Sequence, residues 1–364
     1  MIERHGGAVM LAMAVAAAGG VAAVQQPQRD QVAQPTQATV NVSHLGPQVG
    51  ERVPDFTLVD QENHRRTLQS LMGPRGLVLL FYRSADWCPY CKTQLVEEQG
   101  AYDQVRKNGY GLAALSYDPV PVLAGFSRRR GITFPLLSDT GSLVIKRYGL
   151  LNTTIPTTNE LFGYPFPGTF VLNREGVVTA RFFEDTYQER DTVSSVLVRI
   201  GERVDVAGTH VATPELDVTA FSTDAVAAPG THLSLVLDVT PAARVHVYAP
   251  GVSGGYRPIA LTVQPQAGLV VRAASFPKPE DYFFEPLNEH VAVYQKPFRI
   301  VQDVALDSSR EGAAALRDRQ GMTIAATLSY QACDDRLCFN PRSVPLSFAI
   351  GVKRLDTERA AKPQ

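Results

Sequence analysis

Residues 76–95 read GLVLLFYRSADWCPYCKTQL, and this stretch decides the fold of the first half of the chain. Its first seven residues, 76–82, form a continuous apolar run that ends at the polar segment RSAD, as in a strand buried on both faces of a sheet. Residues 92–107 then place apolar side chains at helical spacing. A buried strand, a short polar loop and a helix therefore follow one another, and two cysteines lie where the helix begins.

Cys88 and Cys91 have a spacing that suits a redox centre, half of a zinc site or a plain disulfide. At the start of a helix, free backbone N–H groups and the helix dipole stabilise a thiolate. Cys88 is therefore the candidate nucleophile, and Cys91 the residue that resolves its product. A zinc site needs four ligands, and no second C-x-x-C or H-x3-H motif lies nearby. A bridge across so small a loop would stabilise little. We favour the redox centre and expect no metal or other cofactor.

The sequence around this stretch alternates strands and helices. Further strands are predicted at 111–118 and in a hairpin over 168–182, and helices within 122–130, 142–149 and 186–203. Such alternation predicts an α/β sheet.

Beyond about residue 206 the sequence becomes rich in short β-strands separated by Gly, Pro and Asp. Apolar residues alternate with polar or small ones in 322–331 and 344–350, which indicates half-buried antiparallel strands. Several such strands at short spacing predict a β-sandwich, with Pro345 placing its strand at a sheet edge.

The second cysteine pair, Cys333 and Cys338, follows the strand 322–331 and encloses the turn-like segment DDRL. A tight hairpin would bring the two sulfurs together. From the spacing alone, a structural disulfide and a redox role are equally good interpretations in an exported protein.

The N-terminus predicts export. Residues 1–23 contain a cationic start, an apolar stretch and a small-residue cleavage site, as in a signal peptide, and 24–46 form a polar linker. Residues 354–364 are expected to be a flexible tail. The net charge of −1 provides no basic field for nucleic acid. We therefore expect a soluble protein of the periplasm or the extracellular space.

Four motifs carry a resemblance to a known superfamily: VPDFTLVDQ, LVLLFYRSADWCPYCKTQL, FPLLSD and YPFPGTFVLNREG. In this order they resemble the peroxiredoxin and thioredoxin-like (AhpC/TSA) proteins over 47–203. The resemblance implies that Pro167, or in its place Pro165, is a cis-proline facing the cysteines. The peroxidases of this superfamily have Pro and Thr where this chain has Phe81 and Ala85, and thioredoxin has a carboxylate at the position of Tyr82.

The segments VHVYAPG, FPKPEDYFFEPLNEHVAVYQKPFRI and LSYQACDDRLCFNPRSVPLSF resemble the N-terminal periplasmic domain of the DsbD thiol:disulfide interchange protein. That domain has an immunoglobulin-like fold, and the resemblance covers 204–353. It implies that Cys333 and Cys338 form a reversible disulfide that exchanges electrons with thioredoxin-fold or membrane thiol-disulfide partners. It also implies that Tyr282–Phe284 match a cap over the pair, although ordinary core aromatics explain them equally well.

The predicted fold is thus an α/β thioredoxin-like domain followed by an all-β immunoglobulin-like sandwich. The leading functional hypothesis is an exported thiol-disulfide oxidoreductase whose domains exchange electrons between Cys88 and Cys333. One alternative is a thiol peroxidase reduced by its own β-domain, and another is a non-catalytic docking protein for a membrane redox partner. A copper chaperone would need a histidine near the cysteines, and the seven histidines are scattered. Glu97 and Glu98 are interpreted as a solvated helix face rather than as proton acceptors.

Overall fold

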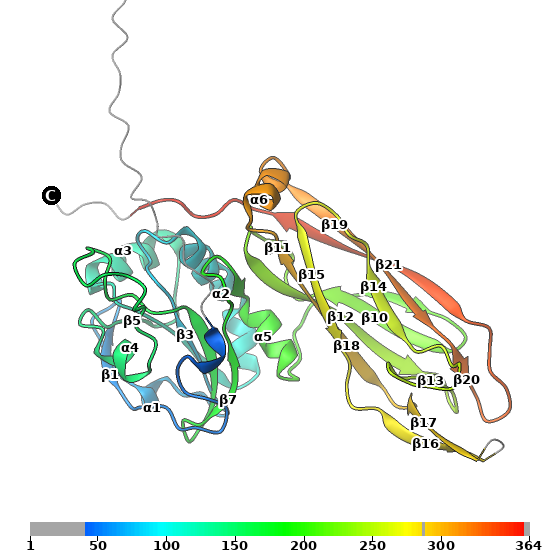
Figure 1. Cartoon of the computed structure of the whole chain (residues 1–364). Coiled ribbons are helices and arrows are strands. Elements are labelled where there is room, and N and C mark those ends of the chain that lie inside the picture. The colour runs from blue at the N-terminus through cyan, green and yellow to red at the C-terminus, as the bar shows by residue number, and fades with distance from the viewer. Residues whose placement is uncertain (1–40, 286–287, 360–364) are drawn as a thin grey trace, which may run out of the picture. The chain divides into compact units, whose positions relative to one another are not determined.

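The first domain is built around the strand that begins residues 76–95. The computed structural model describes residues 41–285 and 288–359. The strand joins a seven-stranded sheet in the order β2-β1-β5-β4-β3-β6-β7, where β3 lies between parallel β4 and antiparallel β6 (Figure 1). The strands are β1 (Thr57–Asp60), β2 (Arg65–Thr67), β3 (Gly76–Phe81), β4 (Tyr110–Ser116), β5 (Leu136–Ser138), β6 (Gly168–Asn173) and β7 (Val178–Phe182).

Helices cover both faces of this sheet, since every residue of β3 is buried. One face packs against Leu95, Phe126 and Leu197 from three helices, and the opposite face packs against Leu68 and Ile145 from two others. The helices are α1 (Leu68–Leu71), α2 (Pro89–Lys107), α3 (Val120–Arg130), α4 (Leu143–Arg147) and α5 (Val193–Arg199), preceded by a 3-10 turn, η1 (Val42–His44). The predicted α/β fold is confirmed.

The helix predicted over 186–203 is shorter than expected. Only α5 is helical, and β8 (Arg190–Asp191) is extended and pairs in parallel with the start of a strand in the second domain. The apolar face of Val193, Val196 and Leu197 is buried, as its spacing predicted. The residues before it are extended because their backbone hydrogen-bonds across the domain junction, which helical periodicity cannot report.

The second domain consists of antiparallel sheets, as predicted for an immunoglobulin-like sandwich. One sheet has the order β15-β18-β12-β10-β9, a second β11-β21-β19-β14, and a smaller one β16-β17-β13-β20. The strands are β9 (Thr209–Ala212), β10 (Leu216–Ser222), β11 (Val226–Ala227), β12 (Thr231–Pro241), β13 (His246–Tyr248), β14 (Ala260–Val263), β15 (Leu269–Ser275), β16 (Glu280–Phe284), β17 (Glu289–Tyr294), β18 (Phe298–Leu306), β19 (Gly321–Tyr330), β20 (Ala332–Cys333) and β21 (Arg342–Val352), with one helix, α6 (Arg310–Leu316).

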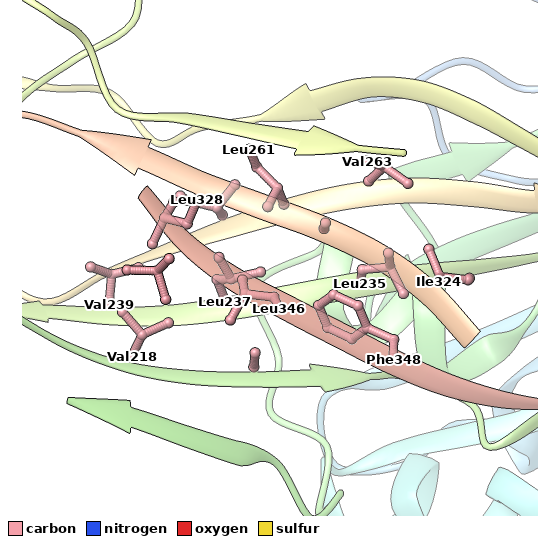
Figure 2. Packing of buried hydrophobic residues seen from close by; sticks show 14 of the residues in the cluster. Val218, Leu235, Leu237, Val239, Leu261, Val263, Ile324, Leu328, Leu346 and Phe348 are labelled. Carbon is pink, nitrogen blue, oxygen red and sulfur yellow. The ribbon is translucent and has the colours of Figure 1, made fainter. Parts of the chain in front are cut away.

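The core of this domain lies between its two larger sheets. Figure 2 shows Leu235 and Leu237 of β12 facing Ile324 of β19 and Phe348 of β21. Burial alternates along β19 and β21, so the predicted period of two is confirmed. Pro345 is opposite Thr327 in β19, and β11 pairs with β21 only at Gly351 and Val352, so no described strand pairs with β21 at the proline. A residue without an N–H is tolerated at such an edge.

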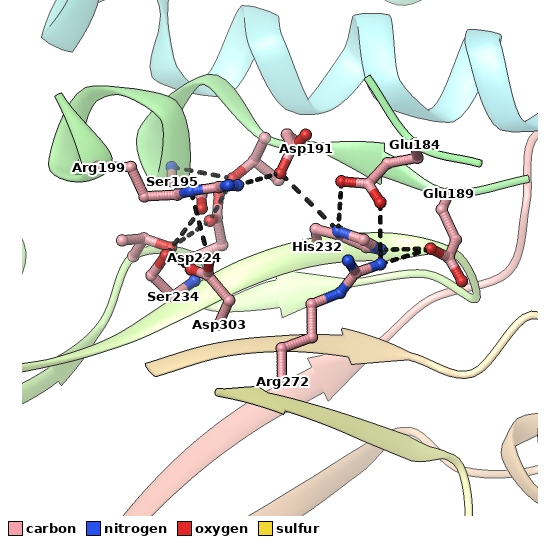
Figure 3. A network of polar contacts seen from close by, with 12 residues as sticks. Glu184, Glu189, Asp191, Ser195, Arg199, Asp224, His232, Ser234, Arg272 and Asp303 are labelled. Carbon is pink, nitrogen blue, oxygen red and sulfur yellow. Dashed lines mark hydrogen bonds and ion pairs between the residues drawn. The ribbon is translucent and has the colours of Figure 1, made fainter. Parts of the chain in front are cut away.

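The two domains are joined by β8 and by a network of charges. Arg190 and Asp191 pair with Thr231 and His232 at the start of β12. Figure 3 shows His232 between the carboxylates of Glu184 and Glu189, with Nδ1 to Glu184 Oε1 at 3.3 Å and Nε2 to Glu189 Oε2 at 3.0 Å. The guanidinium groups of Arg272 and Arg199 and the carboxylate of Asp303 complete the network.

Both ends of the described chain are hydrogen-bonded to the first domain. Arg181 donates to the backbone carbonyls of Val42, Ser43 and Leu45, within the predicted linker. Residues 354–359, called the strap below, contact α2 and α3, within the segment for which the sequence predicts a flexible tail. The predicted signal peptide lies outside the described residues. No helix in 41–285 or 288–359 has the length and apolar character to cross a membrane.

Candidate active site

The first cysteine pair forms a disulfide at the start of α2. Cys88 is the N-cap residue of this 19-residue helix, and Pro89 occupies the first turn, where its missing N–H costs no hydrogen bond. The backbone N–H of Cys91 donates to Cys88 Sγ at 3.2 Å. Cys88 is 1% exposed and Cys91 is fully buried. The helix N-terminus thus favours negative charge on Cys88, as predicted for a nucleophilic thiolate.

A buried carboxylate holds the loop that leads into the pair. Asp118 follows β4 and accepts hydrogen bonds from the hydroxyls of Ser84 and Ser116 and from the backbone N–H of Ala85. Burial raises the pKa of Asp118 to about 6, although these hydrogen bonds oppose the shift. The sequence could have predicted Asp118 as a site residue, because it follows β4, and the parallel strands β3 and β4 end at the same edge of the sheet.

Two buried arginines lie near the WCPYC motif, Arg190 at Cys91 and Arg83 at Trp87. Arg190 Nη2 is 3.6 Å from Cys91 Sγ. The guanidinium group of Arg83 lies 4.6 Å from the ring centres of Trp87 and Tyr164 and 4.4 Å from that of Tyr187. Within the described ranges, neither arginine has a carboxylate within ion-pairing distance, and Arg83 Nε and Nη1 and Arg190 Nε have no hydrogen-bond partner. Arg83 is therefore part of the buried surroundings of the motif.

The Arg190 guanidinium group favours the reduced form of the pair. Burial, followed by repulsion from Arg83, lowers the pKa of Arg190 to about 9. Reduction of the disulfide supplies a thiolate, whose negative charge compensates the buried positive charge. A contact that stabilises the reduced form makes a disulfide more oxidising. No local sequence pattern predicted Arg190 as a site residue, because the pattern of residues 186–203 predicts a helix.

Glu97 and Glu98 are not on a solvated helix face. Glu98 is 1% exposed and accepts the backbone N–H of Val193 at the start of α5. Glu97 lies 3.1 Å from Lys353 Nζ and accepts from the hydroxyl of Thr231 in β12. Burial raises the pKa of Glu97 to about 7 and that of Glu98 well above its usual value. Both carboxyl groups connect α2 to neighbouring elements.

Pro167 is buried at the start of β6, where Gly168 pairs with Phe81 at the end of β3. It therefore lies at the sheet edge from which the cysteine loop departs. The expectation of a cis peptide bond at Pro167 or Pro165 is wrong, since no peptide bond of the described residues is cis. A role for Pro167 in orienting a bound disulfide stays a prediction.

The second cysteine pair also forms a disulfide, and its two sulfurs differ in accessibility. Cys333 ends β20 and is 2% exposed, whereas Cys338 is exposed. The hydroxyl of Tyr248 in β13 lies 3.0 Å from Cys333 Sγ and 3.5 Å from Cys338 Sγ. Burial raises the pKa of Tyr248 to about 12, so the phenol keeps its proton at neutral pH. It can therefore donate a hydrogen bond to a sulfur that leaves as a thiolate.

An aromatic cavity of about 110 Å3 surrounds this pair. His246, which is opposite Cys333 in the β13–β20 pair, lines the cavity with Tyr282 and Phe284. Phe283 alternates outward, is 49% exposed and packs on His290. Two of the three predicted cap residues thus line the cavity. The expectation that no histidine lies near the cysteines is wrong, and the alternation of His246 and Tyr248 in one strand was the available signal.

Removal of the Tyr248 hydroxyl is expected to slow reduction of the second disulfide. In a Cys88→Ser/Cys91→Ser background, Tyr248→Phe should lower the rate of reduction by dithiothreitol roughly tenfold, since a hydrogen bond to a charged group contributes about 1.5–3 kcal/mol. Tyr256→Phe is the matched control, because Tyr256 stacks on Tyr248 but its own hydroxyl donates to Glu289. Equal rates for Tyr248→Phe and the parent would contradict this role.

One group of described side chains has the composition of a metal site. Ligand atoms of Glu184, Asp191 and His232 lie within 4.8 Å of one another. However, Arg272 Nη2 lies 2.9 Å from Glu184 and 2.7 Å from Glu189, so the charge of these carboxylates is already compensated. The group is the ion-pair network of the domain junction.

Comparison with known proteins identifies the family of the first domain. Residues 49–181 match the model of the AhpC/TSA family. Alkyl hydroperoxide reductase E from Mycobacterium tuberculosis is 31% identical over 136 residues, which cover 37% of this chain and 84% of that protein. The chain belongs to the AhpC/TSA family. Members of this family are oxidoreductases that reduce hydroperoxides, so the prediction of an oxidoreductase is confirmed.

Two further proteins are similar to the first domain, and a separate family model matches the second domain. A putative peroxiredoxin bcp of Coxiella burnetii is 28% identical over 36% of this chain and 86% of that protein. The crystal structure of peroxidoxin BcpB from Mycobacterium tuberculosis is 25% identical, covers 40% of this chain and 90% of its own, and has a TM-score of 0.36. Residues 216–347 match the N-terminal region of thiol:disulfide interchange protein DsbD. The AhpC/TSA chain therefore carries a second, DsbD-like redox domain.

Proposed function

We propose that the chain is an exported, periplasmic thiol oxidoreductase in which the β-domain dithiol passes electrons to the Cys88–Cys91 disulfide. The observation that carries the proposal is the buried guanidinium group of Arg190 beside Cys91, which favours the reduced form of that centre. The likeness of the second domain to DsbD supports both the periplasmic location and an external thiol-disulfide partner that reduces Cys333–Cys338.

The exchange at the β-domain begins at Cys338. A donor thiolate attacks the exposed Cys338 Sγ, the Cys333–Cys338 bond breaks, and Cys333 leaves as a thiolate beside the Tyr248 hydroxyl. Cys333 takes up a proton, and the donor's second thiolate attacks the donor sulfur of the mixed disulfide. Cys338 then leaves as a thiolate, so the β-domain ends as a dithiol and the donor as a disulfide. The same asymmetry makes Cys338 the sulfur that forms the transient bond with Cys88, in place of the Cys333 expected from the sequence.

The exchange is proposed to take place between two copies of the chain or after the domains separate. The smaller sheet with Cys333 follows the far end of β12, whereas β8 and Arg190 pair with its first residues. At about 3.3 Å per residue, the eleven residues of β12 span more than 30 Å. The two disulfides are therefore too far apart for direct exchange while this junction is intact.

A trapping experiment tests the relay. In a Cys91→Ser/Cys333→Ser chain, Cys338 is activated with 5,5′-dithiobis(2-nitrobenzoic acid), and a Cys88–Cys338 mixed disulfide is expected by mass spectrometry. The matched Cys91→Ser/Cys338→Ser chain should give little Cys88–Cys333 product, because Cys333 is 2% exposed. The absence of any cross-link in both chains would refute the relay, and a dominant Cys88–Cys333 product would refute the choice of Cys338.

A second candidate is reduction of a hydroperoxide at Cys88. The named relatives favour it, as does the 1% exposure of Cys88, which leaves access mainly to small oxidants. The Cys88 thiolate would attack the peroxide oxygen and release an alcohol or water, and Cys91 would condense with the sulfenic acid to form the disulfide and release water. The β-domain dithiol would then reduce this disulfide. Phe81 and Ala85, in place of the usual Pro and Thr, favour a slow peroxidase.

A further inference from the structure

The strap, residues 354–359, contacts the first domain on both sides of the WCPYC motif. Upstream, the guanidinium group of Arg359 contacts both carboxylate oxygens of Asp86, two residues before Cys88, at 3.1 and 2.7 Å. Downstream, the backbone N–H of Asp356 donates to the hydroxyl of Thr93, two residues after Cys91. Lys92, which lies between Cys91 and Thr93, donates to the backbone carbonyl of Glu358. The strap thus spans the motif.

Acidic side chains anchor the strap on a basic surface of α2 and α3. Arg130 contacts both oxygens of Asp356 at 2.7 and 3.1 Å and also contacts Glu358 at 2.7 Å. Arg129 lies 3.3 Å from Glu358. Paired two-point contacts between arginine and carboxylate are the stronger kind of ion pair. The side chain of Asp356 is 11% exposed, which limits screening of this contact by solvent.

The strap also connects the motif to the second domain. It continues directly from β21, which pairs with β19 along its length, through Lys353, which pairs with Glu97 on α2. The first turn of α2 is therefore fixed by a segment from the far end of the sequence. Cys88 and Cys91 are 1% and 0% exposed in this arrangement.

We infer that the strap determines which oxidants reach Cys88. Exchange with a protein disulfide requires the Cys88 thiolate to attack one partner sulfur in line while the other leaves as a thiolate, so the partner backbone must approach Cys88 closely. Cys91 then attacks Cys88 Sγ, which releases the partner as a dithiol and forms the Cys88–Cys91 disulfide. A hydroperoxide needs no such approach. The closed strap therefore admits small peroxides and restricts the approach of protein dithiols and disulfides. The inference rests on the proposed thiol chemistry, whose relay then takes place with the strap displaced.

Truncation of the strap tests whether it restricts protein disulfides more than hydroperoxides. A chain ending at Lys353 retains β21 and the Lys353–Glu97 ion pair, and a chain ending at Arg359 is the matched control that retains the strap. Both carry Cys333→Ser and Cys338→Ser, so that only the first centre reacts. After reduction, each is mixed with oxidised DsbA, a strongly oxidising protein disulfide, or with hydrogen peroxide, and the Cys88–Cys91 disulfide is quantified by quenched alkylation and mass spectrometry.

Loss of the strap is expected to raise the rate with oxidised DsbA by at least roughly tenfold, and the rate with hydrogen peroxide by less than about twofold. In the chain ending at Arg359, Asp356→Asn should give a smaller change in the same direction without shortening the strap. Equal acceleration with both oxidants, or none with DsbA, would overturn the strap inference while leaving the thiol chemistry intact. A failure of both chains to react with either oxidant would instead refute the proposed function.

Discussion

Replacement of Arg190 by methionine is expected to make the Cys88–Cys91 disulfide harder to reduce. Arg190 Nη2 contacts Cys91 Sγ at 3.6 Å, and within the described ranges this guanidinium group has no carboxylate within ion-pairing distance. A hydrogen bond to a charged group contributes about 1.5–3 kcal/mol, which corresponds to roughly 30–60 mV for a two-electron couple. The reduction potential of Arg190→Met should therefore be more negative by that amount, and its thiolate should form at higher pH.

The potential is measured by equilibration with glutathione buffers in a Cys333→Ser/Cys338→Ser background, and the thiolate by its ultraviolet absorbance during a pH titration. Arg190→Lys keeps a positive charge and should restore part of the potential. Arg75→Met is the matched control, because Arg75 pairs with Glu202 on the surface of the same domain. If Arg190→Met left the potential unchanged, the proposed direction of electron flow would lose its physical basis.

Stability is expected to respond differently from potential in the Arg190→Met chain. A buried positive charge without a carboxylate partner destabilises the folded state, and methionine fills a similar volume without that charge. The free energy of unfolding should therefore be unchanged or higher in the oxidised protein. A large loss of stability would indicate that Arg190 mainly supports the fold, and the potential would then need a different explanation.

Loss of His232 is expected to destabilise the domain junction by about 3–5 kcal/mol, since it leaves buried carboxylates without a partner. His232 is 3% exposed between Glu184 and Glu189, with Asp191, Arg199, Arg272 and Asp303 around it. Burial lowers its pKa, but the hydrogen bonds to Glu184 and Glu189 outweigh burial and raise the pKa to about 9. The imidazolium form therefore predominates in the folded protein at neutral pH.

The raised pKa of His232 also predicts a pH dependence. Its stabilisation is complete below the unfolded pKa of 6.5 and is lost as pH rises through the folded pKa of about 9. The shift corresponds to about 3 kcal/mol. The lowered pKa of Glu184 and the raised pKa of Asp191, to about 6, act below this window.

Urea unfolding at pH values on either side of this window measures both effects. His232→Leu should be less stable than the parent near neutral pH and should lack the alkaline loss between 6.5 and 9. His210→Leu is the matched control, because His210 pairs with Asp217 at 2.7 Å on the exposed surface, where the contribution of such a pair is small. An alkaline loss of the same size in His232→Leu would show that another group titrates.

The sequence by itself determined the elements and the identity of the two redox pairs. The strand within 76–82 is apolar at every position and is therefore buried on both faces of its sheet. The strands within 322–331 and 344–350 alternate apolar and polar or small residues, so each buries one face. Cys88 at a helix start and the strand–turn position of Cys333 and Cys338 also follow from local pattern. These features depend on neighbours in the sequence, which is why periodicity and spacing predict them.

Tertiary structure alone decided the surroundings of each pair. Arg190 reaches Cys91 because β8 is extended across the domain junction, where helical periodicity had predicted a helix. The strap lies beside WCPYC although more than 250 residues separate Asp356 from Thr93 in sequence. Glu98 and His232 are buried because partners from other elements satisfy their charges. A side chain's charge state, exposure and contacts depend on distant segments, and no local sequence pattern encodes that proximity.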